Sequence, residues 1–245
     1  MKDLLLVVPS RGRPQNIARL QDAMTATCRG DTTLIVGLDE DDPTRGDYPD
    51  GPGYEVRPGL RSVVPWINEL AVPQAGNFRY TGHIGDDNVP LTDGWDVAIM
   101  EALEATPFAF GNDLYPRAPG SLCCHVFTRS EVIARLGYFG PPSIRHMYVD
   151  VAWMAWGVKT GITYLDDVVL EHRHFTTGKA PADDSYAASQ ALIPSDLERW
   201  HEYCNSGQLN ADIAKIDPAA PTFTADELRQ FNIGLFIPPH WGAAW

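Results

Sequence analysis

The chain has few cysteines, no cluster of basic residues and no long apolar run. The absence of CxxC spacing predicts reduced structural thiols instead of a zinc site. The cysteines are Cys28, Cys123, Cys124 and Cys204. The 19 Lys and Arg against 32 Asp and Glu give a net charge of −13, which disfavours nucleic acid as a partner because its phosphates need clustered cations. The first apolar run, LLLVV, is too short for a membrane span or a secretory signal, so we expect a cytoplasmic protein without a membrane segment.

The 245 residues do contain short apolar runs that alternate with amphipathic stretches. This pattern is typical of an α/β fold in which helices flank a mostly parallel central sheet. We expect strands at residues 4–10, 32–40, 78–87, 107–112, 121–129 and 161–175. We expect helices that begin at Pro14, near residue 62, after Trp95, at Ser130 and near Tyr148. Towards the C-terminus, the pairs Ser195/Glu198 and Thr224/Glu227 have capping-box spacing and predict two helix starts.

Acidic side chains follow two of the predicted strands. Asp39 ends the second, and Asp86 and Asp87 follow the third in the segment HIGDDN. In open α/β sheets ligands bind beyond the carboxyl ends of the strands, so this placement favours a site. Gly85 allows close backbone approach, and a cation such as Mg²⁺ or Mn²⁺ would relieve the repulsion between adjacent carboxylates. The alternative is that Asp86 or Asn88 only satisfies backbone N–H groups of the turn.

Two further acidic features have competing interpretations. The stretch 39–51 does not match a calcium-binding EF-hand loop, because its fifth and sixth positions are Pro43 and Thr44. Asp150 falls in the middle of a predicted apolar helix, where a carboxylate needs a partner or a catalytic reason. Arg145 and Arg173 are the candidate partners.

Two histidines close the last predicted strand. His172 and His174 alternate along it, so we expect only one of them to reach a site shared with the acids. A site of two histidines and one carboxylate for iron is disfavoured, because His83 and Asp86 lack the tight HxD spacing.

Taken in order, these segments resemble the GT-A glycosyltransferases of the family 2 type, including small phage-encoded members. VVPSRGRP resembles the family's opening segment, and LIVGLDEDDP resembles its second strand, whose first acid contacts the nucleotide base. INELAVPQAGNFRYTGHIGDDN resembles the segment that ends in the metal-binding DXD motif. In that register Gly85 takes the first acid position and Asp87 the last, which makes Asp87 the metal candidate and Asp86 its helper.

The second half of the resemblance covers residues 126–142 and 148–174. Asp150 matches the second acid of the family's ED pair, which is the general base of inverting members, and Val149 replaces the first acid. His174, ahead of His172, matches a late histidine that reaches metal or diphosphate. Lys179 follows on a loop.

The resemblance implies a GT-A catalytic domain at residues 1–190 and a helical C-terminal extension at 191–245. Residues 1–95 would form the nucleotide-sugar half and residues 96–190 the acceptor half. It implies Mn²⁺ or Mg²⁺ held by Asp87 and His174, with Asp150 as the catalytic base. The expected nucleotide-sugar contacts are Pro9, Ser10, Arg11, Arg13, Asp39, Asn68, Asp86 and Lys179. The alternative for Arg11 and Arg13 is that they are exposed surface charges that contact only solvent.

The implied function is transfer of a sugar from a nucleoside-diphosphate sugar, with UDP-sugars favoured, to a hydroxyl of a protein, a glycan or a small molecule. A metal-dependent phosphohydrolase or nucleotidyltransferase would use the same acids. A non-catalytic nucleotide-sugar or glycan-binding module is a third hypothesis, supported by Gly85 and Val149 at positions where the family has acids. The C-terminal helices and the final PPHWGAAW offer apolar surface for an oligomer. A phage-encoded protein would act in the host cytoplasm.

Overall fold

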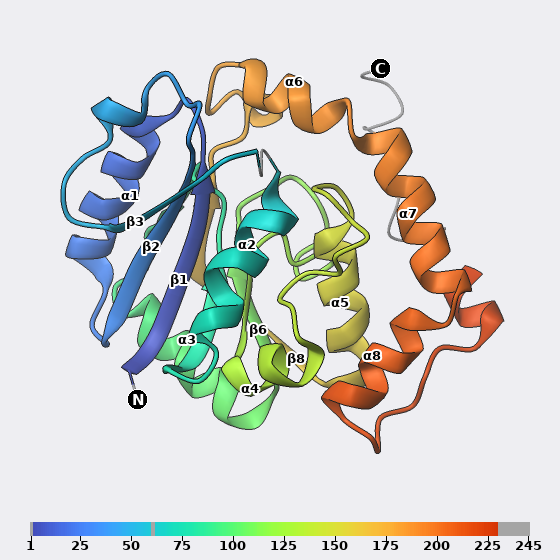
Figure 1. The fold of residues 1–245 in the computed structure, drawn as a ribbon. Helices are drawn as coiled ribbons and strands as arrows, with labels where there is room; N and C mark the ends of the chain where they lie inside the picture. Colours follow the sequence, from blue (N-terminus) through green and yellow to red (C-terminus); the bar gives the residue numbers. More distant parts are fainter. Residues whose placement is uncertain (1, 60–61, 230–245) are drawn as a thin grey trace.

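The computed structural model describes residues 2–59 and 62–229, and in this part of the chain the strands form one mixed sheet (Figure 1). The strand order is β3-β2-β1-β4-β7-β6-β8-β5. The strands are β1 (Lys2–Ser10), β2 (Thr32–Asp39), β3 (Gly53–Arg57), β4 (Phe78–His83), β5 (Asn88–Pro90), β6 (Phe108–Asn112), β7 (Val126–Arg129) and β8 (Ile162–His172).

Six of these strands run in one direction. β1 pairs in parallel with β2 and β4, β2 with β3, and β6 with β8. β7 is antiparallel to both β4 and β6, so β6 and β8 return to the direction of β1. The carboxyl ends of six strands therefore share one edge, where ligands bind in open α/β sheets. The predicted mostly parallel α/β sheet is confirmed.

Helices cover both faces of this sheet. They are α1 (Pro14–Thr27), α2 (Val63–Ala71), α3 (Trp95–Ala105), α4 (Ser130–Leu136), α5 (Val149–Thr160), α6 (Asp184–Gln190), α7 (Ile193–Asn205) and α8 (Gln208–Ile216). The alternation of side chains along β1 feeds two cores. Leu4 and Leu6 pack with α1 and α3, whereas Leu5 and Val7 pack with α2, α4 and α5. A strand buried on both faces explains the continuous apolar run at the start of the sequence.

The C-terminal helices α7 and α8 pack into the core that contains Leu5 and Val7, because Trp200 of α7 and Ile213 of α8 are fully buried in it. The capping box at Thr224 and Glu227 is confirmed: Glu227 N–H donates to Thr224 Oγ1 at 3.2 Å, and Thr224 N–H donates to Glu227 at 2.8 Å. The one predicted at Ser195 is wrong, because α7 already begins at Ile193. The closing PPHWGAAW lies outside the described residues, so its role in an oligomer stays a prediction.

Three local predictions were wrong in detail. β3 and β5 were not predicted, since β3 is a five-residue edge strand and β5 has only three residues. The pair Cys123 and Cys124 precedes β7 instead of lying on it. Asp150 lies in the first turn of α5, not in its middle.

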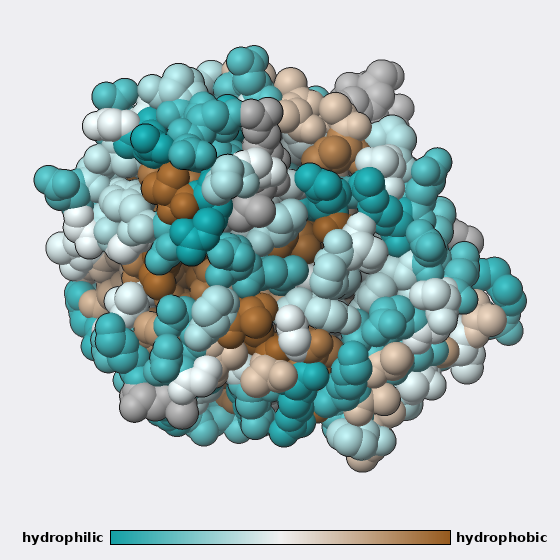
Figure 2. Space-filling model, viewed as in Figure 1, coloured by the Kyte–Doolittle hydropathy of each residue, from teal (hydrophilic) through white to brown (hydrophobic). Residues whose placement is uncertain are grey.

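None of the described helices is both long and apolar enough to cross a membrane. Most of the face in Figure 2 is hydrophilic, with separate small apolar patches.

Candidate active site

Most of the predicted site residues lie at the carboxyl edge of the sheet. Ser10 ends β1, Asp39 ends β2 and His172 ends β8, while the turn with Asp86 and Asp87 follows β4. Helix α6 lies across this edge in Figure 1. Arg13 and Asp183, the N-cap of α6, meet at this edge although they are 170 residues apart in sequence.

Asp86 is held from the β1 side. Arg13 Nη1 donates to Asp86 Oδ1 at 3.0 Å, and Ser10 Oγ donates to Oδ2 at 2.7 Å. The same guanidinium donates through Nε and Nη2 to Asp183, the N-cap of α6, at 2.7 Å each. Such a bidentate pair is strong and directional. Arg13 therefore joins the turn after β4 to α6 instead of standing free in solvent.

Asp87 turns the other way, towards β8. Tyr186 Oη donates to Asp87 Oδ2 at 2.7 Å, and His172 Nε2 lies 3.3 Å from the same oxygen. The backbone N–H of Arg173 donates to the Asp87 carbonyl at 2.9 Å. The Arg13 guanidinium lies over the Tyr186 ring at 4.1 Å from its centre. The two adjacent acids thus have separate partners.

These surroundings move the pKa values of the two acids in opposite directions. Burial raises the pKa of Asp86 to about 6, because it outweighs the opposing effect of Arg13. Burial also acts to raise the pKa of Asp87, but His172 and the Tyr186 hydrogen bond outweigh it and the pKa is lowered. Burial opposes protonation of His172, yet the Asp87 carboxylate prevails and raises the pKa of that imidazole. Asp87 is therefore the firmly ionised acid of the pair.

The two histidines lie on the same side, which corrects the expectation that they face opposite ways. Their ring centres are 5.1 Å apart. The expectation is wrong because side chains two residues apart along an extended chain lie on the same face, and His174 is still extended, with φ −85° and ψ 151°. The polar contact with Asp87 is made by His172. His174 Nδ1 instead lies 2.7 Å from Thr176 Oγ1, and burial lowers the pKa of His174 to about 4.

Gly85 is required by the geometry of the turn. Its N–H donates to Asn88 Oδ1 at 3.0 Å, and a Cβ built on Gly85 would lie only 2.6 Å from Asp87 Oδ1. Any side chain here would displace the Asp87 carboxylate. The missing first acid of the DXD pattern is therefore a consequence of how Asp87 is placed.

Asp39 is almost completely buried at the end of β2. Trp66 Nε1 donates to its Oδ1 at 3.1 Å, and Arg11 Nη1 lies 3.3 Å from its Oδ2. Arg11 also pairs with the exposed Asp41 at 2.6 Å. Gly37 leaves room for the Trp66 ring, which a Cβ at that position would meet at 2.5 Å. Arg11, half-exposed above Asp39, is the cation at this end of the site.

Asn68 faces the backbone instead of the open edge. Its Oδ1 accepts from the N–H groups of Phe139 at 2.7 Å and Gly140 at 2.9 Å, and its Nδ2 donates to the Gly140 carbonyl at 2.8 Å. Both ends of the amide are thus engaged in joining α2 to the turn before α5. Its predicted contact with a nucleotide stays a prediction.

Two other predicted residues have simple surroundings. Lys179 Nζ pairs with Glu171 Oε1 at 2.9 Å, next to the end of β8. Pro9 lies in β1 opposite Gly37 of β2, one residue before the site begins at Ser10. Neither contact by itself indicates a ligand.

Asp150 is held at the N-terminus of α5. Its Oδ1 accepts from the Val151 N–H at 2.9 Å, and Cys124 Sγ lies 3.8 Å from Oδ2. Burial raises the pKa of Asp150, while the Val151 N–H and the nearby Arg117 oppose the shift. The cation near this carboxylate is thus Arg117, not the expected Arg145 or Arg173.

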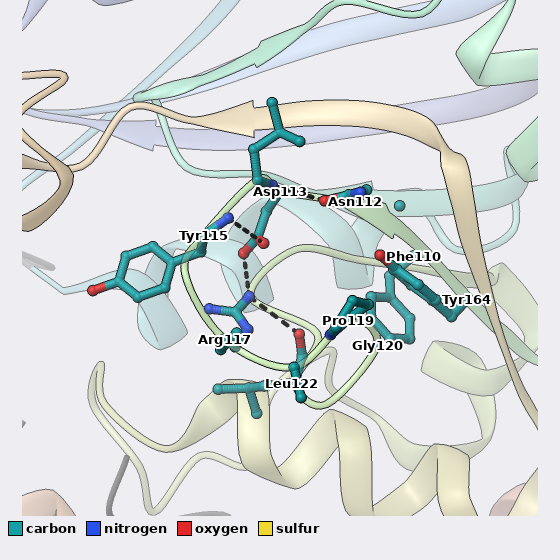
Figure 3. Close-up of a pocket in the computed structure, with 12 residues that line it drawn as sticks. Phe110, Asn112, Asp113, Tyr115, Arg117, Pro119, Gly120, Leu122 and Tyr164 are labelled. Atoms are coloured by element: carbon teal, nitrogen blue, oxygen red, sulfur yellow. Dashed lines mark hydrogen bonds and ion pairs between the residues drawn. The ribbon is translucent and has the colours of Figure 1, made fainter. Parts of the chain in front are cut away.

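A pocket of about 230 Å³ opens in the loop after β6, and Arg117 is one of the residues that line it (Figure 3). Asp113 and Arg117 form an ion pair across it, and Asp113 Oδ1 also accepts from the Tyr115 N–H at 3.1 Å. The Tyr115 ring lies 5.9 Å from the His172 ring. Two of the lining residues therefore have neighbours outside the pocket: Tyr115 is next to His172, and Arg117 is near Asp150.

Four contributors to the site were not predicted as such. Asp183, Tyr186, Tyr115 and Arg117 lie on loops or on a short helix, where no periodicity marks a function. The capping position of Asp183 before α6 was the one local signal available, and it does not reveal the partner Arg13.

The donor set around Asp87 fits a divalent cation that is shared with a substrate. Asp87 Oδ1 accepts no hydrogen bond from the described residues, and the His172 imidazole would supply a nitrogen ligand beside Oδ2 once a cation displaces its proton. Within residues 2–59 and 62–229, no three His, Cys, Asp or Glu side chains form a group that would hold an ion alone. Mg²⁺ typically takes one or two protein carboxylates and completes its shell with water and substrate phosphates. Two protein donors are therefore sufficient only when phosphates supply the rest.

Comparison with known proteins gives matches in structure alone: no family model and no curated protein matches the sequence. Residues 1–349 of S. aureus TarS in complex with UDP superpose with a TM-score of 0.52 at 12% identity, covering 94% of this chain and 78% of that one. Glucosyl-3-phosphoglycerate synthase from Mycobacterium tuberculosis, with Mn²⁺, UDP and phosphoglyceric acid, gives 0.54 at 14% identity, covering 81% and 78%.

A mannosyltransferase from Pyrobaculum calidifontis in complex with GDP-Man and Mn²⁺ gives a TM-score of 0.50 at 11% identity, covering 98% of this chain and 82% of that one. At such low identity the likeness shows the fold, which is that of the GT-A glycosyltransferases, as predicted. The more specific resemblance to phage-encoded members stays a prediction.

Proposed function

We propose that this protein is a metal-dependent glycosyltransferase that uses a nucleoside-diphosphate sugar. The observation that carries the proposal is the contact of Asp87 with His172, at the shared carboxyl edge of six strands. In this proposal Asp87 and His172 hold Mn²⁺ or Mg²⁺, with His172 replacing the expected His174. The bound ion would neutralise charge on the departing diphosphate.

The nucleotide would lie over the ends of β1 and β2, with UDP favoured. Asp39 faces this region with its carboxylate fixed by Trp66, and Arg11 is the half-exposed cation above it. Arg13 keeps Asp86 and the turn after β4 in place through buried contacts, so its role in donor binding is to orient the turn. A half-exposed cation next to a fixed carboxylate suits a nucleotide, which carries both phosphates and a base.

The acceptor would enter from the pocket that is lined by Arg117, the cation near Asp150. Its hydroxyl oxygen forms a bond to the anomeric carbon of the sugar as the bond from that carbon to the diphosphate oxygen breaks. The hydroxyl proton passes to the Asp150 carboxylate, which is the base expected of inverting transfer. Burial raises the pKa of Asp150, and a base with a raised pKa retains a proton more readily at neutral pH. A protein, a glycan or a small molecule all remain acceptor candidates.

The alternative enzymes find less support in the site. Two-metal phosphohydrolases and nucleotidyltransferases clamp both attacking and leaving oxygens with a pair of ions. Such a pair needs several bridging side chains, and the described residues include no group of three metal-binding side chains. Analysis of the products separates these activities. Sugar transfer releases a nucleoside diphosphate, a phosphohydrolase releases phosphate, and a nucleotidyltransferase attaches the nucleotide to the acceptor.

The proposal is tested by comparing the wild type with Asp87→Asn and Asp93→Asn. Asp93 is an exposed acid paired with Arg29 and serves as the matched control. We expect the wild type and Asp93→Asn to bind UDP in a Mn²⁺-dependent way by calorimetry, and to hydrolyse at least one donor among UDP-, GDP- and TDP-sugars. Asp87→Asn should lose the Mn²⁺ dependence. Absence of Mn²⁺-dependent binding in the wild type contradicts the proposal, and binding without turnover would support a non-catalytic module.

A further inference from the structure

The backbone just before α5 adopts a strained conformation. Tyr148, the N-cap of α5, has φ +70° and ψ 2°, in the left-handed region. For a bulky side chain this region costs about 1–2 kcal/mol per residue and persists only where the surrounding structure enforces it. Asp150 is in the first turn of α5, two residues after Tyr148, so whatever fixes Tyr148 also fixes where α5 begins and with it the backbone of Asp150.

The enforcing contacts come from Asp196 in α7. This carboxylate is fully buried and accepts three consecutive backbone N–H groups. Its Oδ1 accepts from Arg145 at 3.2 Å, and its Oδ2 accepts from His146 at 2.8 Å and Met147 at 2.9 Å. Arg199 neutralises the carboxylate from the exposed side at 2.9 Å. A single side chain of the C-terminal helices thereby immobilises the loop that leads into Tyr148.

The opposite side of the same loop is held by the start of α2. Ser62 Oγ donates to the Arg145 carbonyl at 2.6 Å, and the Val64 N–H donates to it at 2.9 Å. Arg145 is therefore anchored through its N–H to α7 and through its carbonyl to α2. Burial raises the pKa of Tyr148, and the charges of Asp150 and Asp196 add to this shift.

We infer that Asp196 is a positioning residue for the transfer reaction: through the backbone of residues 145–147 it fixes Tyr148 and thereby the Asp150 carboxylate. The inference rests on the proposed function for its catalytic consequence. It makes the C-terminal helices part of the acceptor half of the site, although they contribute no group that touches the reacting atoms. A displacement of about 1 Å in a catalytic group can lower turnover by about 100-fold.

The chain offers a matched control in Asp212 of α8. Asp212 is also fully buried in the C-terminal helices, but its partners are Tyr138, Tyr203 and Gln208, none of which lies in the loop. Asp196→Asn and Asp212→Asn should both lower the unfolding temperature. Only Asp196→Asn should accelerate hydrogen–deuterium exchange in the peptide that covers residues 143–150.

Turnover provides the second measurement. We expect Asp196→Asn to lower kcat by about 10- to 100-fold while Mn²⁺-dependent UDP binding and the donor KM stay unchanged. Asp212→Asn should keep the wild-type kcat. Should Asp196→Asn fail to fold, Ser62→Ala removes one anchor from the other side of the loop and should show the same two effects at smaller size.

Unchanged exchange in residues 143–150, or faster exchange with an unchanged kcat, would overturn the inference. An equal loss of kcat in Asp212→Asn would also overturn it, since the effect would then be general destabilisation. If the wild type neither binds UDP nor transfers sugar, the proposed function fails. The exchange comparison then still decides whether Asp196 fixes the loop.

Discussion

Asp96, at the start of α3, is the buried acid for which a loss of stability can be worked out most directly. Its carboxylate is fully buried and accepts from four donors at the amino end of β2. The Arg29 and Val97 N–H groups donate to Oδ1 at 3.0 Å each, and the Gly30 N–H and Thr32 Oγ1 donate to Oδ2 at 2.9 and 2.8 Å. This location is the opposite edge of the sheet from the candidate active site.

Replacing Asp96 by Asn should destabilise the fold without affecting the site. An amide retains one acceptor oxygen and turns an NH₂ group towards N–H donors, so about two of the four hydrogen bonds are lost. Each buried donor left unsatisfied costs about 1–3 kcal/mol. Because Arg29 and Gly30 are partly exposed, water replaces part of the loss, and we expect a decrease of about 2–3 kcal/mol in the free energy of unfolding at pH 7. Mn²⁺-dependent UDP binding should be unchanged.

The pH dependence provides the sharper part of this prediction. Burial acts to raise the pKa of Asp96, but the hydrogen bonds from Arg29, Thr32, Gly30 and Val97 outweigh it and lower the pKa. A carboxyl group with a lowered pKa contributes stability above its unfolded pKa of about 4, and this contribution is lost as the pH falls. The difference between wild type and Asp96→Asn should therefore shrink between pH 7 and pH 3.

Urea denaturation followed by tryptophan fluorescence measures this difference at each pH. Asp93→Asn, three residues away and exposed, should change the unfolding free energy by less than about 0.5 kcal/mol. A difference between wild type and Asp96→Asn that is below 1 kcal/mol at pH 7, or that does not vary with pH, would refute the reasoning.

Two further predictions concern the turn that carries Asp87. Gly85→Ala should weaken Mn²⁺-dependent UDP binding, because its Cβ would lie 2.6 Å from Asp87 Oδ1, whereas Gly76→Ala, with no atom within 4 Å of its Cβ, should not; equal affinities by calorimetry would contradict the role of Gly85. Tyr186→Phe should weaken Mn²⁺ binding about tenfold, since it removes the hydrogen bond that orients the Asp87 carboxylate. Unchanged or tighter binding would show that Tyr186 is not needed for this orientation.

The sequence predicted the sheet and the edge that carries the site, because both depend on local patterns. Apolar runs identify buried strands, and acids directly after them must lie at the carboxyl edge once the strands are parallel. Asp39 and Asp87 were placed at this edge by this route, and their roles in binding stay predictions. The edge strand β3 and the three-residue β5 were missed because they are too short or too exposed to give a pattern.

The side chains that contact the site residues could not be predicted in the same way. Arg13 reaches Asp183, 170 residues away, through a loop and a short helix that carry no motif. His172 and His174 lie on one face, as alternation along an extended chain requires for residues two apart, but which of them contacts Asp87 is decided by packing around the end of β8. Long-range pairs of this kind follow from the packing of α6 against the sheet edge.

The adjacent acids of the GDDN turn show how one local pattern can have a less obvious physical solution. Two neighbouring carboxylates repel each other, and a shared cation is the simplest way to relieve that repulsion. In this fold Asp86 turns to Arg13 and Ser10, and Asp87 turns to His172 and Tyr186, so the repulsion is already relieved by separate partners. A bound cation would therefore draw one protein carboxylate from this turn, not two. Its affinity should depend on the phosphates of the nucleotide-sugar, which makes joint binding of Mn²⁺ and UDP the expected behaviour, with weak binding of either alone.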